Sequence, residues 1–325
     1  MVAENIEETI RNQLKNTLKE TNFSNLGNLY RGKVRDNYTK GDIRIIIATD
    51  RISSFDRVIT TIPFKGQMLN EISTFWFNKT KNIAKNHLID VPDPNVSVVE
   101  QCATVPIEMI VRAYITGTMW RNYLKGEETS GIVLPKGIKR NQKFDDILIT
   151  PSTKAETGHD IYISKEEILK NNMIDKEVYE KMEEIALKLF KFGQNYCEKN
   201  GLILVDTKYE FGLKEGEIIV IDEIHTQDSS RFWIEDTYTE KFEKGEEPEI
   251  LDKEIFRGWL METYPEIFPD IKPDQDIPPI SDDIKIELAK KYMESFYKIT
   301  GQDFRAEITD VHQRIYENLK ETHYL

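Results

Sequence analysis

The sequence predicts an α+β fold, because strand-like segments dominate its first third and strands mixed with longer helices follow. Three observations carry this prediction. Residues 43–49 form a β-branched run, residues 202–221 contain two strand-like runs joined by a short turn, and residues 178–192 have a helical pattern of apolar residues. A doubly wound fold would instead alternate strands and helices regularly, so this order argues against it.

The elements follow in order along the chain. The pattern of residues 1–25 predicts a short amphipathic helix followed by the segment that leaves it. The patterns of residues 29–38, 43–49 and 105–111 predict strands. One helix interrupts these strands, since its apolar residues are spaced to form one buried face: Met68, Leu69, Ile72, Phe75 and Trp76.

A second region begins near Tyr114. Ser164 and Glu167 have the spacing of a capping box, and the helix beyond them carries an apolar stripe. Asn200 and Gly201 suit the left-handed conformation that ends such a helix. The stripe on this helix consists of Val178, Met182, Ile185, Leu189 and Phe192.

From about residue 251 the chain is predicted to be helical around a proline-rich connection, without recognisable chemistry.

Composition limits the class of protein. A chain of 325 residues with 39% hydrophobic residues can form one large or two modest domains, and its formal charge of −13 argues against a nucleic-acid-binding surface. Cys102 and Cys197 do not make a disulfide framework. No run is long enough to span a membrane, and residues 1–25 are too polar for a signal peptide. We therefore expect a cytoplasmic protein with no membrane or nucleic-acid partner.

The two strand-like runs within 202–221 carry the strongest chemical signal. Side chains alternate along a strand, so Asp206, Lys208 and Glu210 share one face, and the returning run is followed by Asp222. A hairpin would bring Glu210 and Asp222 together, and paired carboxylates suit Mg²⁺ that also binds phosphate oxygens. A solvated charged face is the alternative, but the anion-binding groups within 225–231 favour a site.

Two earlier segments are weaker signals. In the segment 30–36, Gly32 permits close backbone approach to a ligand, and Lys33 and Arg35 alternate onto one face where they could meet phosphates. Basic residues on a strand are more often surface residues. The polar loop 48–56 follows a buried strand, as functional loops often do, but a turn capped by serine and aspartate explains it nearly as well.

Two later segments complete the set. Arg112 is followed by the Thr-Gly-Thr sequence 116–118, which offers hydroxyl and amide donors suited to a phosphate monoester. The segment 150–160 is hydrophilic and contains glycine and proline, so the default interpretation is a surface loop. No phosphate-binding motif of the GxxxxGK[ST] or GxGxxG type occurs, and the histidines lack metal-ligand spacing.

Together these segments resemble the phosphoribosylaminoimidazole-succinocarboxamide synthase (SAICAR synthetase) family, in its longer form. The resemblance runs in the family's order from residue 29 to 233 and rests on LYRGKVRDNY, ATDRISSFD, IPFKGQMLNEISTFWF, VPIEMIVRAYITGTMWRNY, TPSTKAETGHD, LILVDTKYEFG and IDEIHTQDSSRFW. Gln227 stands where the family often has proline, which affects loop stiffness but removes no functional group.

The resemblance implies two lobes with ATP between them. Residues 1–107 would form an antiparallel β lobe similar to the ATP lobe of protein kinases, and residues 108–325 a larger α+β lobe with the substrate site and the C-terminal helices. The implied reaction joins carboxyaminoimidazole ribonucleotide (CAIR) to L-aspartate through an acyl phosphate, with ATP converted to ADP and phosphate in purine biosynthesis.

The resemblance also implies roles for individual residues. Lys208 and Asp206 would be catalytic, and Glu210 and Asp222 would hold Mg²⁺. The ATP-binding set would be Lys33, Val34, Arg35, Ile107, Glu108, Met109, Lys154 and Ile221, with residues 107–109 contacting adenine through backbone groups. The substrate-binding set would be Arg112, Thr118, Asp160, Asp228, Ser229, Ser230 and Arg231. Lys154 and Asp160 would belong to a mobile loop.

Two other function classes stay open at this point. A kinase-like small-molecule phosphotransferase could use the same lobes, although the chain has no HRD-x₄-N loop and no DFG motif. A non-catalytic nucleotide-binding relative is the other class, although the charged residues expected in the site are all present. The oligomeric state is not decided by the sequence.

Overall fold

The computed structural model describes residues 3–154, 161–272, 274–306 and 308–325, and its chain divides into two compact units. Unit 1 consists of Met1–Phe75, Leu88–Gln101 and Leu251–Leu325, and unit 2 of Trp76–His87 and Cys102–Ile250. Both units are discontinuous in sequence, whereas the predicted lobes were the continuous ranges 1–107 and 108–325. The assignment of those lobes to ATP and substrate stays a prediction.

Unit 1 is built on a five-stranded antiparallel sheet with the order β1-β2-β3-β7-β6. The β-branched run forms the central strand β3, where Ile45 and Ile47 are fully buried. A separate hairpin pairs β4 with β5. The strands are β1 (Asn28–Arg31), β2 (Arg35–Lys40), β3 (Ile43–Ala48), β4 (Arg51–Ser54), β5 (Arg57–Thr61), β6 (Leu88–Asp93) and β7 (Val96–Glu100).

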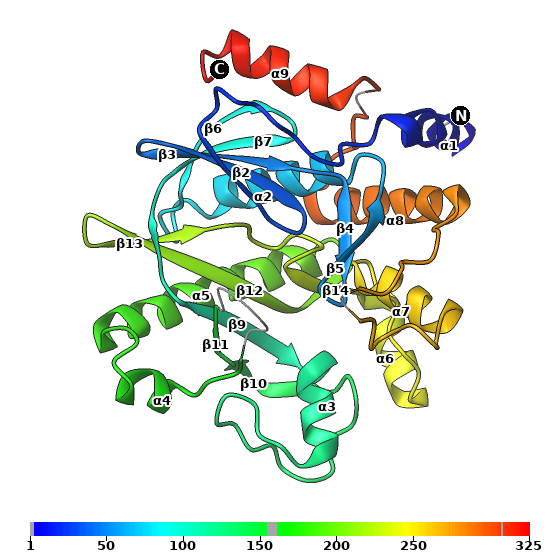
Figure 1. The fold of residues 1–325 in the computed structure, drawn as a ribbon. Coiled ribbons are helices and arrows are strands. Elements are labelled where there is room, and N and C mark those ends of the chain that lie inside the picture. Colours follow the sequence, from blue (N-terminus) through cyan, green and yellow to red (C-terminus); the bar gives the residue numbers. More distant parts are fainter. Residues whose placement is uncertain (1–2, 155–160, 273, 307) are drawn as a thin grey trace. The chain divides into compact units, whose positions relative to one another are not determined.

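Helices from both ends of the chain complete unit 1. The C-terminal helix α9 packs against β6, and α1 packs against α8 (Figure 1). Val311, Ile315 and Leu319 of α9 join the same buried cluster as Tyr38 and Ile45 of the sheet. The helices are α1 (Ala3–Gln13), the 3₁₀ helix η1 (Leu14–Asn16), α2 (Lys65–Thr80), α7 (Glu254–Thr263), α8 (Asp282–Thr300) and α9 (Val311–Glu321), with α2 continuing into unit 2.

The basic segment near the N-terminus differs from its prediction. It forms a hairpin rather than one strand, because Arg31 pairs with Asp36 across a turn in which the Gly32 amide donates to the Arg35 carbonyl over 2.8 Å. Lys33 lies in that turn, so the expected alternation of Lys33 and Arg35 on one strand face was wrong. The Lys33 ammonium group contacts the Asp56 carboxylate.

The polar loop 48–56 is organised by a buried aspartate. The Asp50 carboxylate accepts hydrogen bonds from the backbone amides of Leu18 (2.7 Å) and Gly66 (2.9 Å). Its own amide donates to the Leu18 carbonyl over 2.9 Å. These bonds connect the exit of the N-terminal helix, the β3–β4 connection and the start of α2. They favour the structural interpretation of this loop.

Unit 2 is built around the long strand β12 (Leu202–Lys214). It pairs antiparallel with β9, β13, β14 and β8, while β10 and β11 pair with β9. The predicted hairpin is confirmed, since Lys214 pairs with Glu217 and Glu210 with Ile221. The other strands are β8 (Ala103–Thr104), β9 (Ile107–Tyr114), β10 (Lys143–Ile149), β11 (Ser152–Thr153), β13 (Glu217–Ile221) and β14 (Ser230–Ile234).

The helices of unit 2 agree with the sequence signals. Helix α5 packs against β12 and β9 (Figure 1), and the capping box of Ser164 and Glu167 begins α4. Gly201 has the expected left-handed conformation, with φ of +68°. The predicted stripe on α5 is partly right: Met182, Ile185 and Leu189 are buried, but Val178 and Phe192 are only half-buried, because the buried face is centred on Ala186. The helices are α3 (Gly117–Lys125), α4 (Lys165–Lys170), α5 (Lys176–Glu198) and α6 (Glu235–Lys244).

No helix in the described part of the chain is both long enough and apolar enough to cross a membrane.

Candidate active site

A buried carboxylate between two arginines forms the first part of the site in unit 2. Asp206 on β12 is in register with Arg112 on β9 and with Arg231 on β14, so the three side chains come from adjacent strands. One oxygen of Asp206, Oδ2, accepts hydrogen bonds from Arg112 Nη1 (2.6 Å) and Arg231 Nη1 (2.7 Å). Two guanidinium groups therefore meet one carboxylate, which leaves a local excess of positive charge.

Further contacts hold both guanidinium groups in place. Arg112 is buried, and it donates from Nε to Thr150 Oγ1 and from Nη2 to Tyr162 Oη, both over 2.9 Å. The Arg231 guanidinium lies against Gly117 at the start of α3. A Cβ atom at Gly117 would be 2.7 Å from Arg231 Nη2, so glycine provides the room for this group. Fixed guanidinium donors of this kind suit phosphate and carboxylate ligands.

A second charged cluster lies two residues further along β12. Lys208 Nζ donates to Glu108 Oε1 over 2.7 Å and also contacts Glu210 Oε1. The other oxygen of Glu210 contacts Lys154 Nζ. Ser152 Oγ donates to Glu108 Oε2 over 3.2 Å. Lysine and glutamate side chains thus alternate across β9, β12 and the segment after β11.

Burial and charge act in opposite directions on this cluster. Burial by itself lowers the pKa of Lys208, but the carboxylates of Glu210, Glu108 and Asp222 outweigh it and raise that pKa. Burial likewise tends to raise the pKa of Glu210, but Lys208 and Lys154 hold it well below its usual range. Both groups are therefore charged near neutral pH, and each stabilises the ionised form of the other.

Glu210 and Asp222 are the two carboxylates of the predicted metal site. The β12–β13 register pairs Glu210 with Ile221, the residue before Asp222, and both carboxylates act electrostatically on Lys208. Within the described residues, no group of three or more histidine, cysteine, aspartate or glutamate side chains is arranged to hold a metal ion. Two carboxylates fit Mg²⁺ only as part of its ligand set, with phosphate oxygens and water supplying the rest.

The polar segment after β13 forms a compact turn. Thr226 Oγ1 accepts from the Ser229 amide over 3.2 Å, and the Ser230 amide donates to the Thr226 carbonyl over 3.0 Å. Ser230 Oγ and Thr207 Oγ1 lie 2.7 Å apart and share a hydrogen bond. The turn therefore connects β13 to β14 and holds Ser230 beside β12. Asp228 lies within the same turn.

The structure groups many of the predicted residues but not all of them. Unit 2 brings together Asp206, Lys208, Glu210, Arg112, Arg231, Glu108 and Lys154. Ile107 and Met109 are buried within β9, Ile221 ends β13, and Thr118 lies in the first turn of α3 and accepts from Arg121. Lys33, Val34 and Arg35 lie in unit 1, and Asp160 lies outside the described residues.

Some members of these clusters were not foreseen. Thr150 and Tyr162 orient Arg112, Ser152 contacts Glu108, and Glu108 contributes its side chain, whereas only its backbone was expected to matter. The pairing of β10 and β11 with β9, and of Tyr162 with Ser152, creates the first three contacts, and the register of β9 against β12 brings Glu108 to Lys208. The 150–160 segment did contain a signal, its run of hydroxyl residues, but it has the composition of an ordinary surface loop.

Paired arginines, lysines and carboxylates on one sheet of an α+β protein are typical of enzymes that bind anionic substrates. The chain matches the family model described as SAICAR synthetase over residues 28–270. It belongs to the SAICAR synthetase family.

Curated relatives share most of their length with this chain. The phosphoribosylaminoimidazole-succinocarboxamide synthase of Legionella pneumophila (strain Paris) is 44% identical over 293 residues, which cover 88% of this chain and 92% of that protein. The chloroplastic enzyme of the same name from Arabidopsis thaliana is 42% identical over 322 residues, covering 95% and 77%.

Solved structures have the same fold. SAICAR synthase from Saccharomyces cerevisiae complexed with SAICAR has a TM-score of 0.76 and 32% identity, covering 89% of this chain and 99% of that one. A type-2 SAICAR synthetase in complex with ADP has a TM-score of 0.65 and 25% identity, covering 86% and 100%. These similarities confirm the family and the α+β fold class expected from the sequence.

Proposed function

We propose that this chain is an ATP-dependent ligase that joins the carboxylate of CAIR to the amine of L-aspartate, forming SAICAR, ADP and phosphate in purine biosynthesis. Membership of the SAICAR synthetase family supports this function. The observation that carries it is the Arg112–Asp206–Arg231 group beside the Lys208 cluster. Such an arrangement can hold an anionic ribonucleotide next to a site of phosphoryl transfer.

The chemistry explains why cationic groups dominate the site. A carboxylate resists attack by an amine because it is anionic and lacks a good leaving group. In the proposed reaction a carboxylate oxygen of CAIR forms a bond to the γ-phosphorus as the bond to ADP breaks. The aspartate amine then attacks the acyl carbon, loses a proton and expels phosphate. Positioned cations stabilise the charge that develops in both steps.

For the ribonucleotide, we assign binding to the arginine side of the site. Arg112 and Arg231 would bind its 5′-phosphate and carboxylate, with Thr118 and Ser230 as hydroxyl donors. Asp206 would contact the ribose or imidazole and keep both arginines aligned, since it already accepts from each. Lys208, charged and one-third exposed, would neutralise charge near the transferring phosphoryl group.

For ATP, we assign the lysine–glutamate side of the site together with Lys33, Val34 and Arg35. Ile107, Glu108, Met109 and Ile221 would contact the adenine end, and Lys154 a phosphate. Glu210 and Asp222 would hold Mg²⁺, which would neutralise the phosphate oxygens that it binds. Asp228 and Ser229 would lie near L-aspartate, and Asp160 would belong to the loop that begins at Lys154.

We further propose a cytoplasmic location. Cys102 and Cys197 are both buried and neither is in a disulfide bond, which agrees with a protein that does not depend on such bonds.

The first test of this function measures ADP release from Mg-ATP and CAIR, with and without L-aspartate. Release that requires both substrates, with an equal amount of SAICAR, supports the ligase. Turnover that is indifferent to aspartate would indicate a phosphotransferase. Nucleotide binding without any turnover would indicate a non-catalytic relative.

The second test changes Lys208. We expect Lys208→Ala to lower kcat by about 10²–10³, the usual effect of removing one charged transition-state contact. The matched control is Lys188→Ala, an exposed lysine on α5 that pairs with Glu184, and it should leave kcat unchanged. A near-normal kcat for Lys208→Ala would overturn its assigned role.

A further inference from the structure

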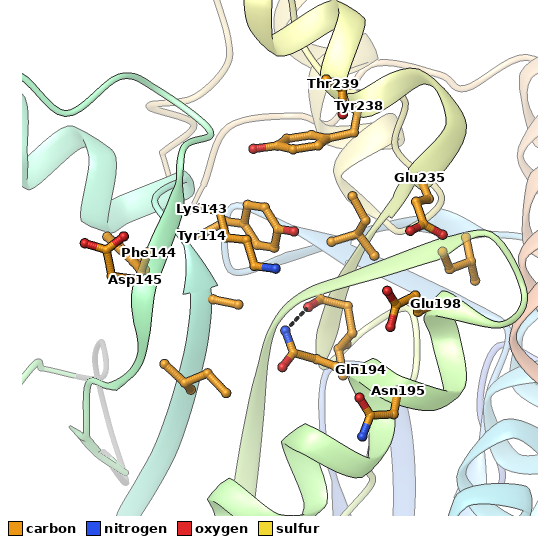
Figure 2. Close-up of a pocket in the computed structure, with 15 residues that line it drawn as sticks. Tyr114, Lys143, Phe144, Asp145, Gln194, Asn195, Glu198, Glu235, Tyr238 and Thr239 are labelled. Carbon is orange, nitrogen blue, oxygen red and sulfur yellow. Dashed lines mark hydrogen bonds between the residues drawn. The ribbon is translucent and has the colours of Figure 1, made fainter.

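Unit 2 contains a cavity of about 450 Å³ that includes none of the residues assigned above. It lies where two neighbouring strands separate. Pairing between β9 and β12 begins at Arg112 and Asp206, but beyond that point Tyr114 pairs only with Lys143 of β10, and Leu202–Leu204 pair only with β14. The end of α5 and the start of α6 close the space between the diverging strands (Figure 2).

Two tyrosine rings line this cavity. The Tyr114 and Tyr238 rings meet edge to face, with centroids 5.4 Å apart and an interplanar angle of 82°. Tyr238 is also stacked on Trp233, with an interplanar angle of 16°. Its hydroxyl donates to the Asn141 carbonyl over 2.8 Å, which fixes the ring. Ala113, Leu202 and Leu204 are buried, and the partly exposed Ile147, Ile203 and Tyr238 supply the accessible aliphatic and aromatic wall.

Carboxylates give the cavity a negative potential. The lining contains Glu198 from the end of α5, Glu235 from the start of α6 and Asp145 from β10, against one basic side chain, Lys143. Figure 2 shows Glu198 and Glu235 on the same side of the cavity, although they come from different helices. Burial, together with Tyr238, Glu235 and Glu198, raises the pKa of Tyr114, as expected where a negative charge is disfavoured.

This chemistry is opposite to that of the site on β12. There, arginines and lysines surround the positions proposed for phosphate and carboxylate groups. Here no arginine lines the cavity, and acids outnumber bases three to one. A nucleotide or another anion would meet repulsion, whereas a cation would be attracted by the carboxylates.

We propose that this cavity is a binding site for a small organic cation, a primary ammonium or guanidinium compound with a planar or aliphatic body. Its volume lies within the range of ordinary ligand pockets, and its lining combines apolar side chains with polar and charged ones. The charged end of the ligand lies between Glu198 and Glu235, and its apolar body lies against the partly exposed Ile203 and Tyr238. Gln194, which donates to the Leu204 carbonyl over 3.5 Å, lies beside the ligand.

The test uses two probes of nearly the same shape, tyramine and tyrosol, which carry an ammonium group and a hydroxyl group respectively. Calorimetric titration of the full chain should show that tyramine binds at least tenfold more tightly, because only its charge engages the carboxylates. The double substitution Glu198→Gln and Glu235→Gln should remove about that tenfold advantage, equivalent to about 1.4 kcal/mol, while leaving tyrosol binding unchanged. The isosteric amides preserve the shape of the cavity.

The control is Glu180→Gln, which removes one exposed acid from α5 at a position outside the cavity. It should leave tyramine binding unchanged, and all variants should retain the wild-type circular dichroism and melting temperature. Equal affinity for tyramine and tyrosol would overturn the proposal, as would an absence of tyramine binding at millimolar concentration. An equal loss in Glu180→Gln would also overturn it, because attraction would then come from the general negative charge of the protein.

Discussion

Gly117 shows how much a single residue contributes to the proposed ribonucleotide site. Its left-handed conformation, with φ of +56°, begins α3, and its missing side chain leaves space for the Arg231 guanidinium. Arg231 in turn reaches Asp206, which also holds Arg112. The position of both arginines therefore depends on a residue that has no functional group of its own.

We predict that Gly117→Ala raises the KM for CAIR by roughly tenfold or more, since a displaced charged hydrogen bond is worth about 1.5–3 kcal/mol. Gly126→Ala is the matched control, because Gly126 ends the same helix with φ of +72° and a Cβ atom added there would meet no other atom within 4 Å. Both variants should lose about 1 kcal/mol of stability through backbone strain. Equal KM values for the two variants would contradict the role of Gly117.

At the scale of elements, one buried carboxylate connects three segments of unit 1. Asp50 accepts from the amides of Leu18 and Gly66, and burial raises its pKa to about 6, although those two bonds and the nearby Lys65 and Arg314 act to lower it. The sequence suggested either a functional loop or a capped turn here. The contacts support the second.

The raised pKa of Asp50 predicts an unusual pH dependence. Because the folded protein holds this proton more tightly than the unfolded chain, the contribution of Asp50 to stability is largest below about pH 4 and is lost as the pH rises to about 6. We expect the difference in unfolding free energy between wild type and Asp50→Asn to fall by about 3 kcal/mol over that interval. Urea unfolding at several pH values measures it. A difference that is constant, or that increases with pH, would contradict the prediction.

At the scale of the whole molecule, the last 75 residues are part of the core of unit 1. The family match ends at residue 270, yet Val311, Ile315 and Leu319 of α9 are packed with Leu18 and Tyr38 from the beginning of the chain. Unit 1 therefore cannot complete its core until the C-terminal helix is present. Val311, Ile315 and Leu319 therefore have a structural role in unit 1.

We predict that Leu319→Ala lowers the free energy of unfolding by about 2–5 kcal/mol, because it removes a fully buried side chain and leaves a cavity. Lys320→Ala, the next residue and exposed, should change stability by less than about 0.5 kcal/mol. Chemical denaturation of both variants provides the comparison. A loss below about 1 kcal/mol for Leu319→Ala would show that α9 is not required for the core.

Prediction from sequence succeeded where the determinants are local. Ser164 and Glu167 form their capping box, and alternation along 202–214 correctly placed Lys208 and Glu210 on one face, where they contact each other. It failed at Lys33, because a Gly-containing turn and a strand have similar composition over three residues. Sequence-based prediction also missed the side-chain role of Glu108. The two paired segments lie about 100 residues apart, and neither segment's sequence predicts that it pairs with the other.

The sequence by itself determined the α+β class, the family resemblance and most residues of the proposed site, because periodicity, capping and motif chemistry act over short stretches of chain. Only the tertiary structure decided which groups meet: two arginines on one oxygen of Asp206, Lys208 between Glu108 and Glu210, and a separate cavity where β9 and β12 diverge. These arrangements depend on strand register and on segments that are distant in sequence. Their energies come from burial and charge pairing that exist only after the chain has folded.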